Sequence, residues 1–442
     1  MSGHSNRGSI HSWAPSEVTE DTRLPITTEI TAVEEVEDFD MAELEGDEIA
    51  MAVMGHRPSS AATGSLGSGR GTSIRCRGRP IDVKEANGLR ELIFGDPKKH
   101  FNDAWCKQGF FFNETSCLRY GLMQHAGGPC GAIAAVQAFI LDYLLFGAGR
   151  QDSQDWESIS APMQSEALLN ALTRIIWRAR AKHESKAVLA LGGQGAITSL
   201  VRSAAYRPDG FTENLVIYEV ATKTELKALI SGSLADFKRE RGLGVVLLVY
   251  SCILTRGIDQ AIADMDQGFE EAPTLIAQHG YASQELVNLF LIGAAHTNVF
   301  DNEKMMDDSV TNTSDVVKLR GIPARGRVGF LTLFESYGYM QVGSHLKDPE
   351  VSIWMVCSES HYSTLFSPSK NLLTAEASSF DLYYYDELAN QKEVIRLSVN
   401  RFPADCAVKS SSEDDLTPPL DMVIRTKWEG ASVDWNGIEP IL

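Results

Sequence analysis

The stretch QHAGGPCGAIAAVQAFILDYLLF, residues 124–146, decides the fold of this chain. A loop with two glycines and a proline opens onto a segment that is apolar at almost every position and has no Gly or Pro from Ala132 to Phe146. A helix that is apolar on all sides is typical of a protein interior. The stretch therefore predicts a buried helix of about four turns, with a cysteine at its start.

That cysteine, Cys130, is the candidate nucleophile. The first turn of a helix lowers the pKa of a thiol through its unpaired backbone N–H groups and the helix dipole. Pro129 suits the first helical position, where its missing N–H costs nothing, and Gly127 and Gly128 let a substrate backbone pass close by. Cys130 is the only one of the seven cysteines with this setting.

A cysteine nucleophile needs a base and a donor for the developing anion. Gln124, six residues before Cys130, is predicted to form an oxyanion hole together with the backbone N–H of the nucleophile. His361, in CSESHYSTLFS, begins an apolar strand and can project across a cleft as the base. If this strand pairs with FDLYYYD, Asp386 falls roughly opposite the imidazole and Asp381 at the far end, which makes Asp386 the better candidate to orient it.

The same residues also have plainer interpretations. A Gly-Gly-Pro-Cys turn is often only a tight helix entry, and a buried Cys there is commonly inert. A His on an apolar strand is more often a satisfied core residue than a catalyst, and His125 is interpreted as a rim residue beside the site. The pattern alone therefore leaves the nucleophile as a hypothesis.

The rest of the chain predicts an α+β protein in two halves. Helical patterns at 164–180, 223–239 and 284–293 belong to a helical half, about residues 81–325, with strands around 214–220. From Gly329 onward the signal changes to short apolar runs between turns, namely FLTLFE, YMQVGS, SIWMVCSE, HYSTLFS, FDLYYYD and EVIRLSV. Such runs predict an antiparallel sheet half, about residues 326–442, that carries His361 opposite the helix of Cys130.

Residues 1–80 are expected to be a disordered arm before the catalytic domain at 81–442. They are rich in Ser, Gly and Thr, and an acidic run extends from Glu29 to Glu48. This composition buries too little apolar area to offset the entropy lost on ordering.

Composition also limits the partners and the compartment. A net charge of −19 argues against nucleic-acid binding and suits a basic protein partner. The seven cysteines are odd in number and form no CxxC pair, so we expect a reducing compartment and neither metal nor cofactor. The first residues lack the apolar core of a signal peptide, and the run GVVLLVYSCIL at 244–254 is too short to span a bilayer. We expect an intracellular protein, cytoplasmic or also nuclear, that does not bind membranes.

Several separated motifs together resemble the MINDY family of deubiquitinases, and in particular its longer-chain branch. They are QHAGGPCGAIAAVQAFILDYLLF, SQELVNLFLIGAAHTNVFDN, IWMVCSESHYSTLFS with FDLYYYDELANQ, and IRTKWEGASVDWNGIEPIL. The resemblance extends from about Asn87 to Leu442. It implies a core similar to papain-like cysteine proteases, with the nucleophile at Cys130, the general base at His361 and the oxyanion-hole glutamine at Gln124.

The resemblance implies a function as well. The chain is expected to hydrolyse isopeptide bonds in polyubiquitin, with a preference for lysine-48-linked chains, through a thioester on Cys130. Asn288, Asn298 and Asp301 lie in the second motif and are hypothesised to line the ubiquitin groove. Two alternatives stay open, namely a ubiquitin-binding scaffold with an idle site and an acyltransferase that uses the same Cys and His.

Overall fold

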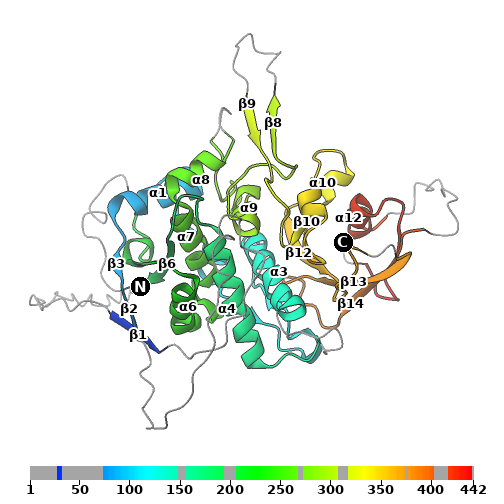
Figure 1. The fold of residues 1–442 in the computed structure, drawn as a ribbon, viewed down its shortest axis with the longest axis horizontal. Helices are drawn as coiled ribbons and strands as arrows, with labels where there is room; N and C mark the ends of the chain where they lie inside the picture. The colour runs from blue at the N-terminus through cyan, green and yellow to red at the C-terminus, as the bar shows by residue number, and fades with distance from the viewer. Residues whose placement is uncertain are drawn as a thin grey trace, which may run out of the picture.

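The computed structural model describes residues 27–31, 73–147, 156–193, 206–266, 272–306, 317–374, 377–402 and 417–440. These residues form a mixed arrangement of helices and sheet, which confirms the α+β class (Figure 1). Most helices lie in the first part of the chain, and a six-stranded sheet forms from Gly329 onward. The predicted arm is described only at 27–31 and 73–80, where short strands occur, and its other residues lie outside the described ranges.

The longer helices are α1 (Val83–Phe94), α3 (Cys130–Phe146), α4 (Ala161–Arg178), α6 (Lys223–Lys238), α7 (Gly244–Arg256), α8 (Ile258–Asp264), α9 (Gln284–Ile292) and α12 (Pro419–Lys427). The short helices are α2 (Asp103–Cys106), α10 (Leu333–Ser336) and α11 (Ser344–Lys347). The helices predicted at 164–180, 223–239 and 284–293 are thus confirmed, with ends that differ by at most three residues.

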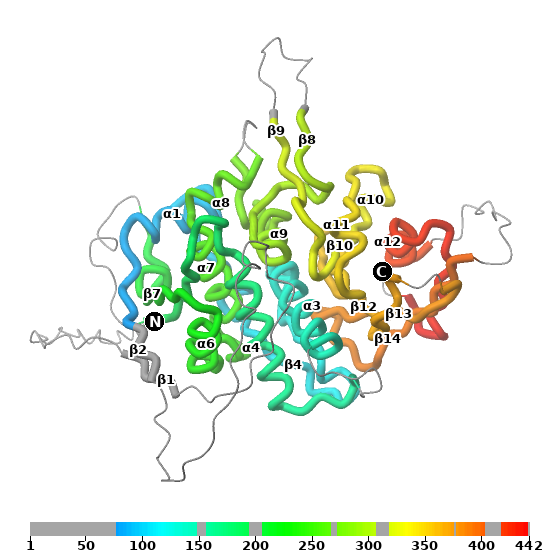
Figure 2. The backbone as a smooth tube through the Cα atoms, viewed as in Figure 1, coloured from blue at the N-terminus to red at the C-terminus, as the bar shows by residue number. Residues whose placement is uncertain are grey.

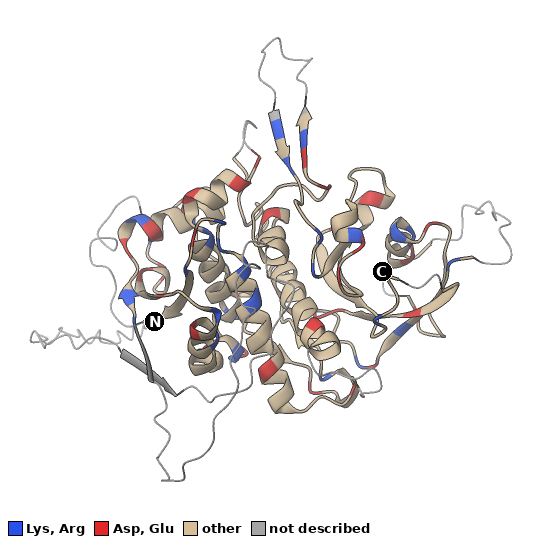
Figure 3. Cartoon of the chain, viewed as in Figure 1, with Lys and Arg blue, Asp and Glu red and all other residues tan. Residues whose placement is uncertain are grey.

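The helix α3 lies at the centre of the molecule. Every residue of α3 except Tyr143 and Phe146 is buried, as its apolar pattern predicts. It packs against α4 and α9 on one side and against strands of the sheet on the other (Figures 1 and 2). Figure 3 shows few charged residues on α3, α7 and α9, in keeping with this burial.

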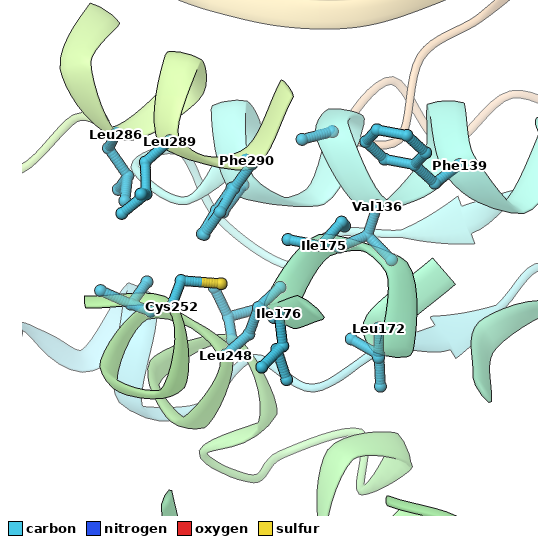
Figure 4. Close-up of a cluster of buried hydrophobic side chains, with 14 of the residues drawn as sticks. Val136, Phe139, Leu172, Ile175, Ile176, Leu248, Cys252, Leu286, Leu289 and Phe290 are labelled. Atoms are coloured by element: carbon cyan, nitrogen blue, oxygen red, sulfur yellow. The ribbon is translucent and has the colours of Figure 1, made fainter. Parts of the chain in front are cut away.

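One apolar cluster joins α3 to its helical neighbours. Figure 4 shows side chains from α3, α4, α7 and α9 meeting in it, namely Val136, Phe139, Leu172, Ile175, Ile176, Leu248, Cys252, Leu286, Leu289 and Phe290. The run GVVLLVYSCIL forms most of the buried helix α7. Among the described residues no single helix has the length and apolarity to cross a membrane. The helices α7 and α8 have the required length and apolarity only when taken together, and they are bent by 86° relative to each other.

The sheet of the C-terminal part has the strand order β10-β11-β12-β13-β14-β15. Its strands are β10 (Gly329–Thr332), β11 (Ile353–Ser358), β12 (His361–Phe366), β13 (Ser379–Tyr385), β14 (Ile395–Asn400) and β15 (Ser432–Asp434). The pairs from β11 to β15 are antiparallel, as predicted.

The predicted antiparallel pairing is wrong at the first pair, because β10 and β11 are parallel. Parallel neighbours need a crossover connection, and α10 and α11 supply it between these two strands. The run FLTLFE is therefore only partly a strand: the Thr332 side chain accepts a hydrogen bond from the Phe334 N–H and caps α10. The run YMQVGS is not a strand but a loop that leads into α11, with Ser344 as the first helical residue.

Smaller sheets complete the fold. Strands β3 (Arg79–Pro80), β7 (Leu215–Val220) and β6 (Ala187–Gly192) pair in that order. Two-stranded sheets form from β1 (Thr27–Thr31) with β2 (Ser73–Arg77), β4 (Phe111–Phe112) with β5 (Leu122–Met123), and β8 (Glu303–Met306) with β9 (Val317–Arg320). The β8–β9 pair projects from the body of the molecule in Figure 2, and β5 leads into the loop before Cys130.

Candidate active site

Cys130 is the first residue of α3. The Pro129 carbonyl accepts hydrogen bonds from the N–H groups of Ala132 at 3.0 Å and Ile133 at 3.1 Å, so Pro129 is the N-cap. This is one residue before the first helical position expected for it. The Cys130 N–H therefore belongs to the first turn, where backbone donors have no partner within the helix, and the dipole favours negative charge on the thiol.

The loop before Cys130 is held by the turn at 277–282. Gly128 has φ 125°, and a Cβ there would lie 3.2 Å from the Gly280 oxygen and 3.3 Å from Trp105 Nε1. The Trp105 indole donates to that same Gly280 oxygen at 2.8 Å. The Ala282 N–H donates to the Gly128 carbonyl at 3.3 Å. Only glycine fits this position, so the structure of the loop is a sufficient reason for Gly128.

Gly127 has a different environment from Gly128. It is exposed, and a Cβ there would meet only the Tyr281 ring at 3.9 Å. A substrate chain could approach the backbone at this point, so Gly127 fits the predicted substrate contact better than the buried Gly128 does. Tyr281, an exposed aromatic beside the loop, is a further rim residue that the sequence analysis did not select.

His361 begins β12, next to a two-residue turn. It pairs with Ser358 across the turn, and Glu359 within the turn has φ 55°. The Cys130 Sγ lies 3.7 Å from the carbonyl oxygen of Ser360, to which it can donate. The structure thus brings Cys130 and His361 together, although they lie 231 positions apart in the sequence.

The side chain of Asp386 fixes the imidazole. Asp386 Oδ2 lies 2.9 Å from His361 Nε2, while its Oδ1 accepts from the N–H groups of Leu388 at 2.9 Å and Ala389 at 3.1 Å. Because Nε2 is taken, Nδ1 is the ring nitrogen left for the thiol. Asp381 lies away from His361 and interacts with Ser398 instead. The structure thus places Asp386, and not Asp381, beside the imidazole, and the orienting role of Asp386 stays a prediction.

His361 carries a raised pKa in this setting. Burial lowers the pKa of the imidazole, but the hydrogen bonds and charges of Asp386 and Cys130 outweigh it and raise the value to about 10. The ring is therefore an imidazolium at neutral pH. This positive ring lies beside the sulfur of Cys130 at the N-terminus of α3, which is the pairing of nucleophile and base that thiol-dependent enzymes use. Cys130 is buried, with 2% of the residue exposed.

Gln124 lies at the end of β5, and both its backbone and its side chain are fixed. Its N–H donates to the Glu387 carbonyl at 2.8 Å, and its Nε2 donates to the Ala126 carbonyl at 2.6 Å. One of its two amide hydrogens stays available, and the buried Oε1 has no partner among the described residues. The side chain thus has one donor left for an oxyanion.

The three polar residues of the second motif have structural partners. Asn288 is fully buried, and its amide donates to the carbonyls of His296 at 2.7 Å and Asn298 at 3.2 Å. With no exposed surface it is not available to a ubiquitin surface, which corrects the expectation for this residue. It instead closes the turn after α9.

Asn298 and Asp301 are partly exposed. The Asn298 amide donates to Asp266 at 2.6 Å, and Asp301 accepts from the backbone N–H groups of Ser344 at 2.8 Å and His345 at 2.9 Å. Asp301 thereby caps the start of α11. Both side chains hold backbone segments in place, and a contact with ubiquitin stays a prediction for them.

Glu387 and Thr364 are parts of the site that the sequence analysis did not select. Glu387 directly follows Asp386, and its carboxyl accepts from the Thr364 hydroxyl at 3.0 Å. An acidic residue in a turn gives no sign that it will be buried, because that depends on which elements pack over the turn. Within the described ranges no group of three or more His, Cys, Asp or Glu side chains is arranged to hold a metal ion.

Comparison with known protein families gives a clear match. The family model described as "Deubiquitinating enzyme MINDY-3/4, conserved domain" matches residues 90–437. None of the solved structures matches this chain.

Curated relatives cover most of this chain. The chain is 43% identical over 373 residues to "Probable ubiquitin carboxyl-terminal hydrolase MINDY-4" of Mus musculus, with 82% of this chain and 47% of that protein covered. The Homo sapiens protein of the same name is 41% identical over 375 residues, with 84% and 47% covered. "Ubiquitin carboxyl-terminal hydrolase MINDY-3" of Homo sapiens is 31% identical over 317 residues, with 67% and 65% covered. The chain spans about half the length of the MINDY-4 proteins that it matches.

Proposed function

Because the chain belongs to the MINDY-3/4 family of deubiquitinating enzymes, we propose that it hydrolyses the isopeptide bond after the C-terminal Gly-Gly of ubiquitin. Polyubiquitin is the substrate, and the reaction passes through a thioester on Cys130. Neither a metal nor a cofactor takes part in the proposed steps. The relatives that support this proposal are named ubiquitin carboxyl-terminal hydrolases.

One observation carries the proposal. The thiol of Cys130, at the N-terminus of α3, lies against the turn that begins β12, and His361 on that strand is held by Asp386 at 2.9 Å. A nucleophile, a base and a group that orients the base are the parts that thiol-dependent acyl transfer requires.

The proposed chemistry has two stages. The Cys130 thiolate attacks the isopeptide carbonyl carbon, and a C–S bond forms while the carbonyl oxygen gains negative charge. The Cys130 N–H and the remaining amide hydrogen of Gln124 are the donors for that oxygen. The C–N bond then breaks, and the His361 imidazolium gives its proton to the departing lysine amine.

Hydrolysis of the thioester completes the cycle. Neutral His361 takes a proton from water, and the resulting hydroxide attacks the thioester carbonyl. The C–S bond breaks, and the ubiquitin chain leaves as a carboxylic acid that gives its proton to the solvent, while the Cys130 thiolate faces an imidazolium again. Atoms and charge balance over the cycle, with one water consumed for each isopeptide bond.

Two finer proposals accompany this one. A nucleophile on a central helix and a histidine on a facing sheet support a papain-like arrangement. A preference for lysine-48-linked chains is proposed from the resemblance of the motifs, and a panel of diubiquitins of all linkages tests it. Equal turnover of every linkage would remove the linkage proposal and leave the hydrolase.

The first experiment uses ubiquitin with a thiol-reactive group at its C-terminus, and it reads adduct formation by mass. We expect an adduct on the wild type, none on Cys130→Ala, and a normal adduct on the matched control Cys117→Ser, which removes another free and partly exposed thiol. A folded protein that binds ubiquitin but forms no adduct would favour the idle scaffold. Product analysis with an added amine acceptor separates a hydrolase from an acyltransferase.

A further inference from the structure

Glu387 is a buried acid beside the candidate active site. It follows β13 and is 2% exposed. Its Oε1 accepts the Thr364 hydroxyl at 3.0 Å, and its Oε2 has no partner among the described residues. A buried carboxyl group with one oxygen left without a partner among the described residues is costly, so it needs a reason beyond packing.

The backbone around Glu387 joins two parts of the site. The Glu387 carbonyl accepts the Gln124 N–H at 2.8 Å, and the preceding residue, Asp386, holds His361 at 2.9 Å. The Tyr385 hydroxyl donates to the Leu122 carbonyl at 2.8 Å, which ties the same strand end to β5. Three consecutive residues thus link the predicted oxyanion donor to the predicted base.

We propose that Glu387 is a positioning residue: its buried carboxyl, held by Thr364, fixes the Asp386-Glu387 segment and thereby sets Gln124 relative to His361. The inference rests on the proposed function and adds a residue to the same site. Glu387 touches neither the thiol nor the imidazole in the contacts described, and it acts through its neighbours.

The charge state of Glu387 supports this role. Burial has the largest effect on Glu387, and the negative charge of Asp386 adds to it; together they raise the pKa of Glu387 to about 8. The charge of His361 opposes the shift. Tyr384 and Tyr385 are the other ionisable groups beside it, and both have a raised pKa. Glu387 is therefore a neutral acid at pH 7. A second carboxylate next to Asp386 would repel it and loosen the segment.

Two substitutions separate the hydrogen bond from the bulk of the side chain. Glu387→Leu keeps the size but cannot accept from Thr364, while Glu387→Gln keeps a neutral acceptor. We expect Glu387→Leu to lower kcat for polyubiquitin about tenfold or more, because small displacements of reacting groups are costly. KM should stay within about twofold, and Glu387→Gln should recover most of the loss.

Thr364→Val removes the same hydrogen bond from the other side and should lower kcat in the same direction.

A stability readout tests the neutral acid independently. Between the ordinary pKa of a glutamate and about 8, the folded protein holds a proton on Glu387 that the unfolded chain has lost. This contribution to stability therefore falls as the pH rises through that window. We expect the melting temperature of Glu387→Gln to fall less steeply from pH 5 to 8 than that of the wild type.

A matched control and a ubiquitin-free assay make the outcome clear. Asp421→Asn neutralises another buried carboxyl with a raised pKa, which accepts from the Trp435 indole at 2.9 Å, and it should leave kcat within about twofold. Alkylation of Cys130 by iodoacetamide at pH 7 should slow in Glu387→Leu and recover in Glu387→Gln.

The two proposals then fail separately. If the alkylation series follows the expectation while the wild type does not cleave ubiquitin, only the proposed function fails. If folded Glu387→Leu has wild-type alkylation and turnover, or if Glu387→Gln is as slow as Glu387→Leu, the positioning role is overturned.

Discussion

At the scale of single residues, Asp386 has the largest influence on the charge of His361. Its Oδ2 lies 2.9 Å from Nε2, and its side chain is 7% exposed while that of His361 is 30% exposed, so water screens the pair only from the imidazole side. His361 should therefore stay positively charged until it loses its proton near pH 10.

Asp386→Asn tests that influence. The amide removes the negative charge that raises the pKa of His361, so that pKa should move down by about one to three pH units. An NMR titration of the His361 ring measures this pKa without ubiquitin. A pKa of His361 that stays where the wild type has it would show that Asp386 does not set the charge of the imidazole.

The two glycines before the nucleophile differ in a testable way. Gly128→Ala forces an L residue to adopt φ 125° against the Gly280 carbonyl, so we expect a loss of about 1 to 3 kcal/mol of stability. Gly127→Ala meets only the Tyr281 ring and should leave stability within about 0.5 kcal/mol. Urea unfolding of the two variants measures both values, and equal losses would contradict the structural reason given for Gly128.

At the scale of elements, the hairpin of β11 and β12 places the imidazole. Its turn contains Glu359 at φ 55°, a left-handed conformation that costs an ordinary L residue about 1 kcal/mol. Pairing across the turn sets Ser358 opposite His361, so the turn determines where β12 begins.

Glu359→Asn should therefore stabilise the protein by up to about 1 kcal/mol, because Asn tolerates the left-handed region. The pairing of β11 with β12 is unchanged, so labelling of Cys130 by the ubiquitin probe should continue. Thermal unfolding measures the gain. A lower melting temperature would mean that the Glu359 side chain makes a contact worth more than the backbone strain.

At the scale of the whole molecule, α3 joins the helices to the sheet. Its buried Asp142 forms an ion pair with Arg174 on α4. A second ion pair, of 2.8 Å, joins Asp142 to Arg327, just before β10. The two arginine side chains are only about a quarter exposed. This charge cluster therefore connects α4 and the first strand of the sheet through the helix of the nucleophile.

Asp142→Ala should destabilise the protein by about 2 to 3 kcal/mol, because it removes the buried carboxylate that Arg174 and Arg327 share, although Arg327 keeps its ion pair with Glu350. Partial exposure of the arginines keeps the loss below that of a fully buried pair. Asp103→Ala breaks an exposed pair with Lys107 and should cost less than about 1 kcal/mol. Denaturant unfolding compares the two, and similar losses would show that the Asp142 cluster does not hold the two parts together.

The sequence by itself determined the elements that depend on neighbouring residues. The apolar run after Cys130 predicts the buried helix, and the strand of His361 follows from its short run of β-forming residues. Both patterns depend on residues a few positions apart, so no distant contact is needed to recognise them. The separated motifs also indicated the family, which the family model supports.

Only the tertiary structure decided which polar groups lie together. Asp386 rather than Asp381 reaches His361, Asn288 is buried instead of exposed, and Glu387 joins the site from a turn. The parallel pairing of β10 with β11 likewise depends on the crossover between them. Strand register and the burial of a polar side chain are set by contacts between residues far apart in the chain, and a local pattern holds no information about such contacts.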